Sequence, residues 1–202
     1  AVEVALGAAM AGARALAAMK HVGVNVAADP IFTASYTGVR GGLVIVTADD
    51  PEMHSSQNEQ DNRHYAIAAK IPMLEPADSA ETKAYTKLAF ALSERFDTPV
   101  FLRTTTRISH ATGAVPLGEI EPSGIPLGFV EEPGKWVMLP VNARKRHVVV
   151  EERMRALREF AETFEGNRIE WGDRSLGLIT AGVAYQYVRE AFPNASVLKL
   201  GL

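Results

Sequence analysis

The residues best suited to chemistry are concentrated in one polar segment, between Asp49 and His64. Its carboxylates and imidazoles are the hard ligands that a metal ion prefers. They are Asp49, Asp50, His54, Glu59, Asp61 and His64. No H-E-x-x-H spacing occurs among them, so the metal-site interpretation has only weak support.

Other functions are open to the same segment. Ser55 or Ser56 could act as the nucleophile of a hydrolase, but neither lies in a G-x-S-x-G motif, which ranks this interpretation lower. The segment could instead contact a ligand, with serine and amide groups on its polar atoms and Arg63 on a carboxylate. It could also be a purely structural loop in which Asp61 caps the following helix. The residues alone do not decide among these interpretations.

The elements on either side predict where this segment lies. Leu43–Thr47 is an unbroken apolar run, and Val100–Arg103 repeats the pattern, which is typical of strands buried on both faces of a parallel sheet. A polar loop just beyond such a strand is where open α/β sheets bind ligands. Helices are expected at 25–38, 61–70, 78–96, 145–164 and 183–192. Strands that alternate with helices predict an α/β fold with a mostly parallel sheet.

The first residues read as one buried helix. Val2–Lys20 consists almost entirely of Ala, Val, Leu, Met and Gly, and Lys20–Gly23 carries signals of a helix end. Glu3 is its only charge before Arg14. Glu3 is either a solvated residue of the first turn, favoured by the helix dipole, or a buried carboxylate kept for chemistry.

The later part of the chain changes character. Residues 113–145 are rich in proline and glycine, which predicts an irregular connector with short edge strands at most. Ser175–Thr180 and Ser196–Leu202 read as strands on either side of a helix, the opening of a second α/β unit. Because the chain begins within a helix pattern and ends on a strand, it is expected to be a fragment of a longer protein.

Composition excludes several classes of site. The chain has 202 residues, no cysteine and a formal charge of −3. Disulfides, thiolate metal sites and cysteine nucleophiles are therefore excluded within it. The charge gives no support for a nucleic-acid surface, and no apolar run approaches the roughly 20 residues of a membrane span. A cytoplasmic protein is the expectation.

Several long motifs resemble one family. HVGVNVAADP at 21–30 and GGLVIVTADDPEMHSSQNEQDNRHYA at 41–66 are similar to the α subunits of indolepyruvate ferredoxin oxidoreductases. PVFLRTTTRISH at 99–110 and ASVLKLGL at 195–202 extend the resemblance along the chain. These enzymes are thiamine-diphosphate-dependent 2-oxoacid:ferredoxin oxidoreductases. The family usually has glycine where Glu52 stands here.

The resemblance implies a division of the chain and a cofactor. Residues 1–112 would be an N-terminally incomplete pyrimidine-binding domain, 113–174 a connector with an amphipathic helix, and 175–202 the start of a transketolase C-terminal-like domain. Thiamine diphosphate would be the cofactor. Magnesium and [4Fe–4S] clusters are expected only in parts of the enzyme outside this chain.

It also implies a reaction and roles for residues. The enzyme would oxidatively decarboxylate arylpyruvates such as indolepyruvate to arylacetyl-CoA and pass electrons through iron–sulfur clusters to ferredoxin. Coenzyme A, a β subunit and the 2-oxoacid are the other expected partners, with no nucleic acid or membrane. The implied cofactor-binding residues are Glu3, which is also catalytic through N1′ of the pyrimidine, and Asn25. The implied substrate-binding residues are Arg63, His54, Ser55, Ser56 and Gln57.

Two alternatives stay open beside this function. A sister oxidoreductase that acts on another 2-oxoacid would share the fold and the cofactor. The chain could also be a catalytically inactive α/β fragment that serves as an assembly module.

Overall fold

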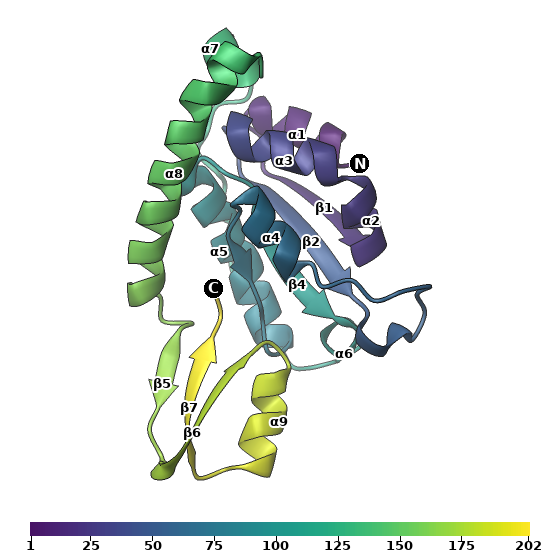
Figure 1. Cartoon of the computed structure of the whole chain (residues 1–202), viewed down its shortest axis with the longest axis vertical. Coiled ribbons are helices and arrows are strands. Elements are labelled where there is room, and N and C mark those ends of the chain that lie inside the picture. Colours follow the sequence, from purple (N-terminus) through teal and green to yellow (C-terminus); the bar gives the residue numbers. More distant parts are fainter.

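A four-stranded parallel sheet forms the centre of the first part of the chain (Figure 1). The computed structural model describes all residues, 1–202. The strands are β1 (Ala15–Lys20), β2 (Leu43–Asp49), β3 (Met73–Leu74) and β4 (Val100–Thr105), in the order β1-β2-β4-β3. The predicted parallel sheet is confirmed, with β2 and β4 as its inner strands.

Helices cover both faces of this sheet, which explains why its inner strands are apolar without alternation. Successive β2 residues point to opposite faces, so Leu43 and Ile45 join one core cluster and Val44 the other. The helices are α1 (Val2–Met10), α2 (His21–Val26), α3 (Ala28–Thr37), α4 (Arg63–Ala69), α5 (Ser79–Phe96) and α6 (Thr106–Ser109). Residues of α1, α3 and α4 belong to the first cluster, and those of α5 to the second.

A second, smaller sheet follows a long helix. After α7 (Pro133–Trp136), α8 (Pro140–Thr163) runs along α3 on the outside of the first part. The sheet then contains β5 (Arg168–Glu170), β6 (Asp173–Ala181) and β7 (Ala195–Leu200), with α9 (Ala184–Ala191) between β6 and β7. Its order is β5-β7-β6; β6 is parallel to β7 and β5 is antiparallel. None of the helices is both long and apolar enough to cross a lipid bilayer.

The two sheets are joined by a buried ion pair. Lys199 on β7 is 0% exposed and its ammonium binds the carboxylate of Glu81 on α5. The N–H of Glu75 also donates to the carbonyl oxygen of Gly201, at 3.0 Å. These contacts bring the start of α9 close to the end of β4, where the carboxyl ends of the parallel strands meet.

The prediction of one helix over Val2–Lys20 is wrong. The helix ends at Met10, and Ala15–Lys20 is a strand that pairs in parallel with β2. Lys20 therefore ends a strand and His21 begins α2, the reverse of the expected helix end. Gly12 makes the reversal, since its φ of +90° is unfavourable for other residues. Pairing with β2 overrides the helical propensity of alanine at this sheet edge.

The remaining element predictions differ in detail. The helix expected at 25–38 is divided at Ala27 into α2 and α3 and ends at Gly38, as predicted. The connector at 113–145 contains no strand but holds the short helix α7, and α8 begins at Pro140 rather than at 145. Asp78 caps the start of α5, because its Oδ1 accepts from the N–H of Glu81 at 2.8 Å. Strand β5 was not predicted.

Candidate functional site

The carboxyl edge of the parallel sheet holds a buried charge pair. Asp49, the last residue of β2, has a side chain only 1% exposed. Its Oδ2 accepts from Nε of Arg103 at 2.7 Å and from the N–H of Asn62 at 3.1 Å. The guanidinium of Arg103 also binds the carboxylate of Glu75. This network ties β2, β4 and both ends of the polar loop together.

Asp50 holds the polar loop in one conformation. Its carboxylate accepts from the N–H groups of Ser55 and His54 at 2.8 and 3.1 Å. It also accepts from the hydroxyls of Ser56 and Thr106 at 2.7 and 2.8 Å. These bonds, led by those from Ser55, Ser56 and Thr106, hold the pKa of Asp50 well below its usual range. The loop therefore folds around a carboxylate that is ionised at neutral pH.

A second set of bonds fastens the loop to β1 and α2. Nζ of Lys20 donates to the carbonyl oxygen of Ser55 at 2.9 Å. Nε2 of the buried His21 lies 3.0 Å from the carbonyl oxygen of Asn58. Nδ2 of Asn25 donates to Oε1 of Gln60 at 3.3 Å. The edge strand that the sequence failed to predict is therefore one of the supports of the loop.

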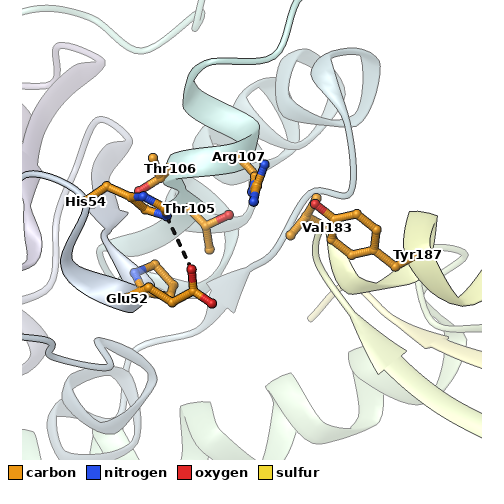
Figure 2. A pocket seen from close by; sticks show the side chains of 8 residues that line it. Glu52, His54, Thr105, Thr106, Arg107, Val183 and Tyr187 are labelled. Atoms are coloured by element: carbon orange, nitrogen blue, oxygen red, sulfur yellow. Dashed lines mark ion pairs between the residues drawn. The ribbon is translucent and has the colours of Figure 1, made fainter.

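The turn that opens the loop is strained at Glu52. Its φ is +65°, and that of Met53 is +54°, both in the left-handed region that glycine adopts most easily. Glu52 thus carries a Cβ in a backbone conformation that is unfavourable for residues other than glycine. This turn lies just after Pro51, and beyond it the side chain of His54 points toward Glu52 (Figure 2).

A cleft of about 450 Å³ opens beside this turn (Figure 2). The polar loop and the end of β4 form one wall, and the start of α9 forms the other. The lining residues are Pro51, Glu52, His54, Thr105, Thr106, Arg107, Val183 and Tyr187. His54 and Glu52 point toward each other, with Nε2 and Oε2 3.7 Å apart. The volume lies within the range of small-molecule sites.

Arg63 lies in a neighbouring cavity and is already paired. Its Nε and Nη2 donate to Asp61 at 2.9 and 2.6 Å, and this side-chain bond lowers the pKa of Asp61 to about 2. The cavity, of about 190 Å³, shares Pro51, Thr105 and Val183 with the larger cleft. The role of Arg63 at a substrate carboxylate stays a prediction.

Glu3 is exposed, in the first turn of α1. Within this chain, Glu3 is therefore a solvated residue of the first turn and not a buried carboxylate. The last turn of α1 binds the backbone before β2, because the N–H of Gly41 donates to the carbonyl oxygen of Ala9. Glu3 lies at the opposite end of the helix, so the first turn of α1 is directed toward the carboxyl edge of the sheet. Its catalytic role stays a prediction.

Two alternative functions of the loop find no support in its geometry. No group of three or more His, Cys, Asp or Glu side chains could hold a metal ion. The hydroxyl of Ser56 donates to Asp50, and Nζ of Lys20 donates to the hydroxyl of Ser55 at 3.2 Å. Neither serine is bonded to a histidine, as a nucleophile with a base would be.

Sequence reasoning placed the loop but missed much of the cleft. Of the predicted residues, His54 lines the cleft. Ser55 and Ser56 do not line it and instead donate hydrogen bonds to Asp50. Asn25 on α2 donates a hydrogen bond to the loop. Gln57 is exposed. Thr105 and Arg107 were missed, although they follow β4 as the polar loop follows β2, and the same edge rule would have found them.

Curated proteins show what this chain is similar to. It is 50% identical over 98% of its length to indolepyruvate oxidoreductase subunit IorA of Archaeoglobus fulgidus. It is 46% identical over its whole length to subunit IorA of Methanothermobacter marburgensis. The resemblance seen in the sequence is confirmed. The chain spans about a third of the length of these relatives, 33% and 34%. No family model matches it.

The fold of this IorA-like chain is also found in a solved structure. The 2-oxoglutarate:ferredoxin oxidoreductase of Magnetococcus marinus superposes on all of this chain and 44% of its own, with a TM-score of 0.74. Sequence identity is 15%, so the likeness shows the fold alone. Both sheets of the chain thus belong to an arrangement that a ferredoxin oxidoreductase shares.

Proposed function

We propose that this chain forms part of an oxidoreductase that converts arylpyruvates, indolepyruvate in particular, to arylacetyl-CoA. In this proposal it acts with a β subunit, and electrons pass through iron–sulfur clusters in other parts of the enzyme to ferredoxin. The names of relatives 46–50% identical to it support the proposal. The proposed domain boundaries are the ones that the sequence resemblance implies. They are a pyrimidine-binding domain at 1–112, a connector at 113–174 and the start of a further domain at 175–202.

The observation that carries the proposal is the fixed loop at the carboxyl edge. Asp50 accepts hydrogen bonds from both backbone and side chains of the loop, and β1 and α2 hold the loop from outside. These bonds hold the loop in one conformation, as a site that orients a ligand requires. The cleft beside it is large enough for an aromatic 2-oxoacid.

Thiamine diphosphate is the cofactor in this proposal, and the residues of α1 fit its pyrimidine end. Glu3 has no hydrogen bond or ion pair within the chain and is exposed beside Val4, which is 78% exposed. The space next to Gly7, one turn further on, is open. The free carboxyl group of Glu3 could bind one ring nitrogen of a flat heterocycle, and its apolar neighbours could contact the face of the ring. When bound, the cofactor supplies the carbanion-stabilising group for loss of carbon dioxide from a 2-oxoacid.

The chain's own residues would then divide the work. Glu3, covered by the ring, would hold or release a proton at N1′, because burial raises the pKa of a carboxyl group. Asn25 would support the cofactor from α2. His54, Ser55, Ser56, Gln57 and Arg63 would shape the substrate side. The diphosphate, its magnesium ion and the [4Fe–4S] clusters would be held outside this chain.

The test uses the oxidoreductase that carries this chain. It should reduce ferredoxin with indole-3-pyruvate and coenzyme A, and more slowly with 2-oxoglutarate or pyruvate. Glu3→Gln should slow exchange of the thiamine C2 proton into deuterated water by about 10²–10⁴-fold, the usual effect of losing a positioned acid–base group. Glu159→Gln, which alters an exposed residue of α8, is the matched control and should exchange like wild type.

The alternatives predict different outcomes. A higher kcat/KM with a non-aromatic 2-oxoacid would identify a sister oxidoreductase. No turnover with any 2-oxoacid, in an assembled enzyme that contains its clusters, would favour an assembly module. Normal proton exchange in Glu3→Gln would exclude Glu3 as the catalytic carboxylate.

A further inference from the structure

The cleft contains an arginine without a partner. Arg63 and Arg103 are bound to carboxylates, whereas the guanidinium of Arg107 makes no hydrogen bond or ion pair within the chain. It is exposed and points across the cleft toward the hydroxyl of Tyr187 (Figure 2). A free guanidinium at the wall of a cleft is suited to bidentate binding of a carboxylate.

Two hydroxyl groups lie where they could complete such a site. Oγ1 of Thr105 is buried and has no hydrogen-bond partner, although its residue lines both cavities. Its neighbour Thr106 is not available, because its hydroxyl is bonded to Asp50. Tyr187 presents its hydroxyl from the opposite wall. A buried hydroxyl without a partner is costly, and a ligand oxygen would satisfy it.

We propose that Arg107 binds the carboxylate of the aryl 2-oxoacid, assisted by the hydroxyls of Thr105 and Tyr187. The proposal rests on the proposed function, because that function supplies the substrate. The aryl group would lie against the apolar part of the wall, formed by Pro51, Val183 and the ring of Tyr187. The binding step breaks no covalent bond and transfers no electron.

Arg107 is better placed for this contact than Arg63. To bind a substrate through Nε and Nη2, Arg63 would first have to leave Asp61, and the substrate would have to compensate for that lost pair. Arg107 has no carboxylate partner to leave, so its binding of a substrate breaks no ion pair. One group opposes the binding of an anion in the cleft, the carboxylate of Glu52. It is 80% exposed, so solvent weakens its repulsion.

The experiment compares arginine variants in the oxidoreductase that carries this chain. Arg107→Met should raise KM for indole-3-pyruvate about 10- to 100-fold, the effect of losing a charge-assisted bond, with a smaller change in kcat and none in KM for coenzyme A. Arg107→Lys should recover part of the loss. Arg63→Met should raise KM less than Arg107→Met. Arg158→Met, an exposed arginine of α8, is the matched control.

Binding is measured separately by calorimetric titration with indole-3-lactate, which keeps the carboxylate and the aryl group but not the keto group. Its affinity should fall by a similar factor in Arg107→Met. Unchanged KM and unchanged lactate affinity would overturn the proposal, as would a rise confined to KM for coenzyme A, which would make the cleft a phosphate site. Absence of 2-oxoacid oxidation in wild type would instead contradict the proposed function, and the lactate titration would still decide the role of Arg107.

Discussion

The buried pair between Asp49 and Arg103 should be the most sensitive point of the sheet edge. Arg103→Met keeps much of the side-chain volume but removes the guanidinium, whose side chain is only 10% exposed. The carboxylate of Asp49, 1% exposed, is then left buried without its cation. Removing one partner of a buried ion pair typically costs about 3–5 kcal/mol of unfolding free energy.

The structure places the expected loss near the lower end of that range, about 3 kcal/mol. Asp49 would keep two neutral donors, the N–H of Asn62 at 3.1 Å and the hydroxyl of Thr47 at 3.2 Å. They stabilise the charge in part after the cation is gone. Glu75, with a side chain 13% exposed, would also lose its partner, but it lies nearer to solvent.

Urea unfolding of the 202-residue chain measures the loss. The double variant Asp49→Asn/Arg103→Met should recover more than about 1 kcal/mol of it, since an amide can accept from Asn62 and donate to Thr47 without a charge. Arg158→Met should change stability by less than about 0.5 kcal/mol. If Arg103→Met also lost less than about 1 kcal/mol, or if the double variant recovered nothing, the claim that Asp49 is a buried, compensated charge would be refuted.

Two further predictions concern the polar loop. Glu52→Gly should raise the unfolding free energy by about 0.5–1 kcal/mol, because glycine relieves the left-handed φ but makes the unfolded chain more flexible. Glu52→Ala keeps a Cβ at the same φ and should give no such gain in urea unfolding; an equal gain would show that charge, and not backbone strain, is the cause. The second prediction is a pH dependence from Asp61, whose pKa is lowered to about 2 in the folded state by its bond from Arg63. A depressed carboxyl pKa stabilises the fold above the unfolded pKa of about 4, and that stabilisation is lost as the pH falls toward 2. Urea midpoints should therefore fall more steeply between pH 4 and 2 in wild type than in Asp61→Asn, and equal slopes would contradict the assignment.

The inner strands could be predicted because their residues report their surroundings directly. Leu43–Asp49 and Val100–Thr105 are covered on both faces, so their apolar runs are unbroken and no other element fits them. Ala15–Lys20 is different. Alanine favours helix in isolation, and this segment becomes a strand only through its pairing with Leu43–Ala48. A preference set by a partner distant in sequence leaves no local signal.

The position of the site could be predicted for the same reason, but its internal bonds could not. A polar loop after a buried parallel strand must lie at the carboxyl edge, whatever its side chains do. Which carboxylate each arginine binds depends on backbone turns such as the one at Glu52. The sequence therefore predicted that Arg63 binds a substrate carboxylate, whereas in the structure it is paired with Asp61. Arg107, for which the sequence predicted no role, has no partner.

Lys199 explains why the far wall of the cleft was missed. A lysine within an apolar strand such as ASVLKL normally indicates a solvent-facing position. Here it is fully buried, bound to Glu81, with its ammonium 5.0 Å from the ring centre of Tyr185. That pair holds the second sheet against α5, and the docked sheet carries Val183 and Tyr187 to the edge of the first. The cleft therefore depends on the buried charge of Lys199, which the strand pattern predicts to lie at the surface. For this reason the sequence did not predict that the two walls of the cleft lie together.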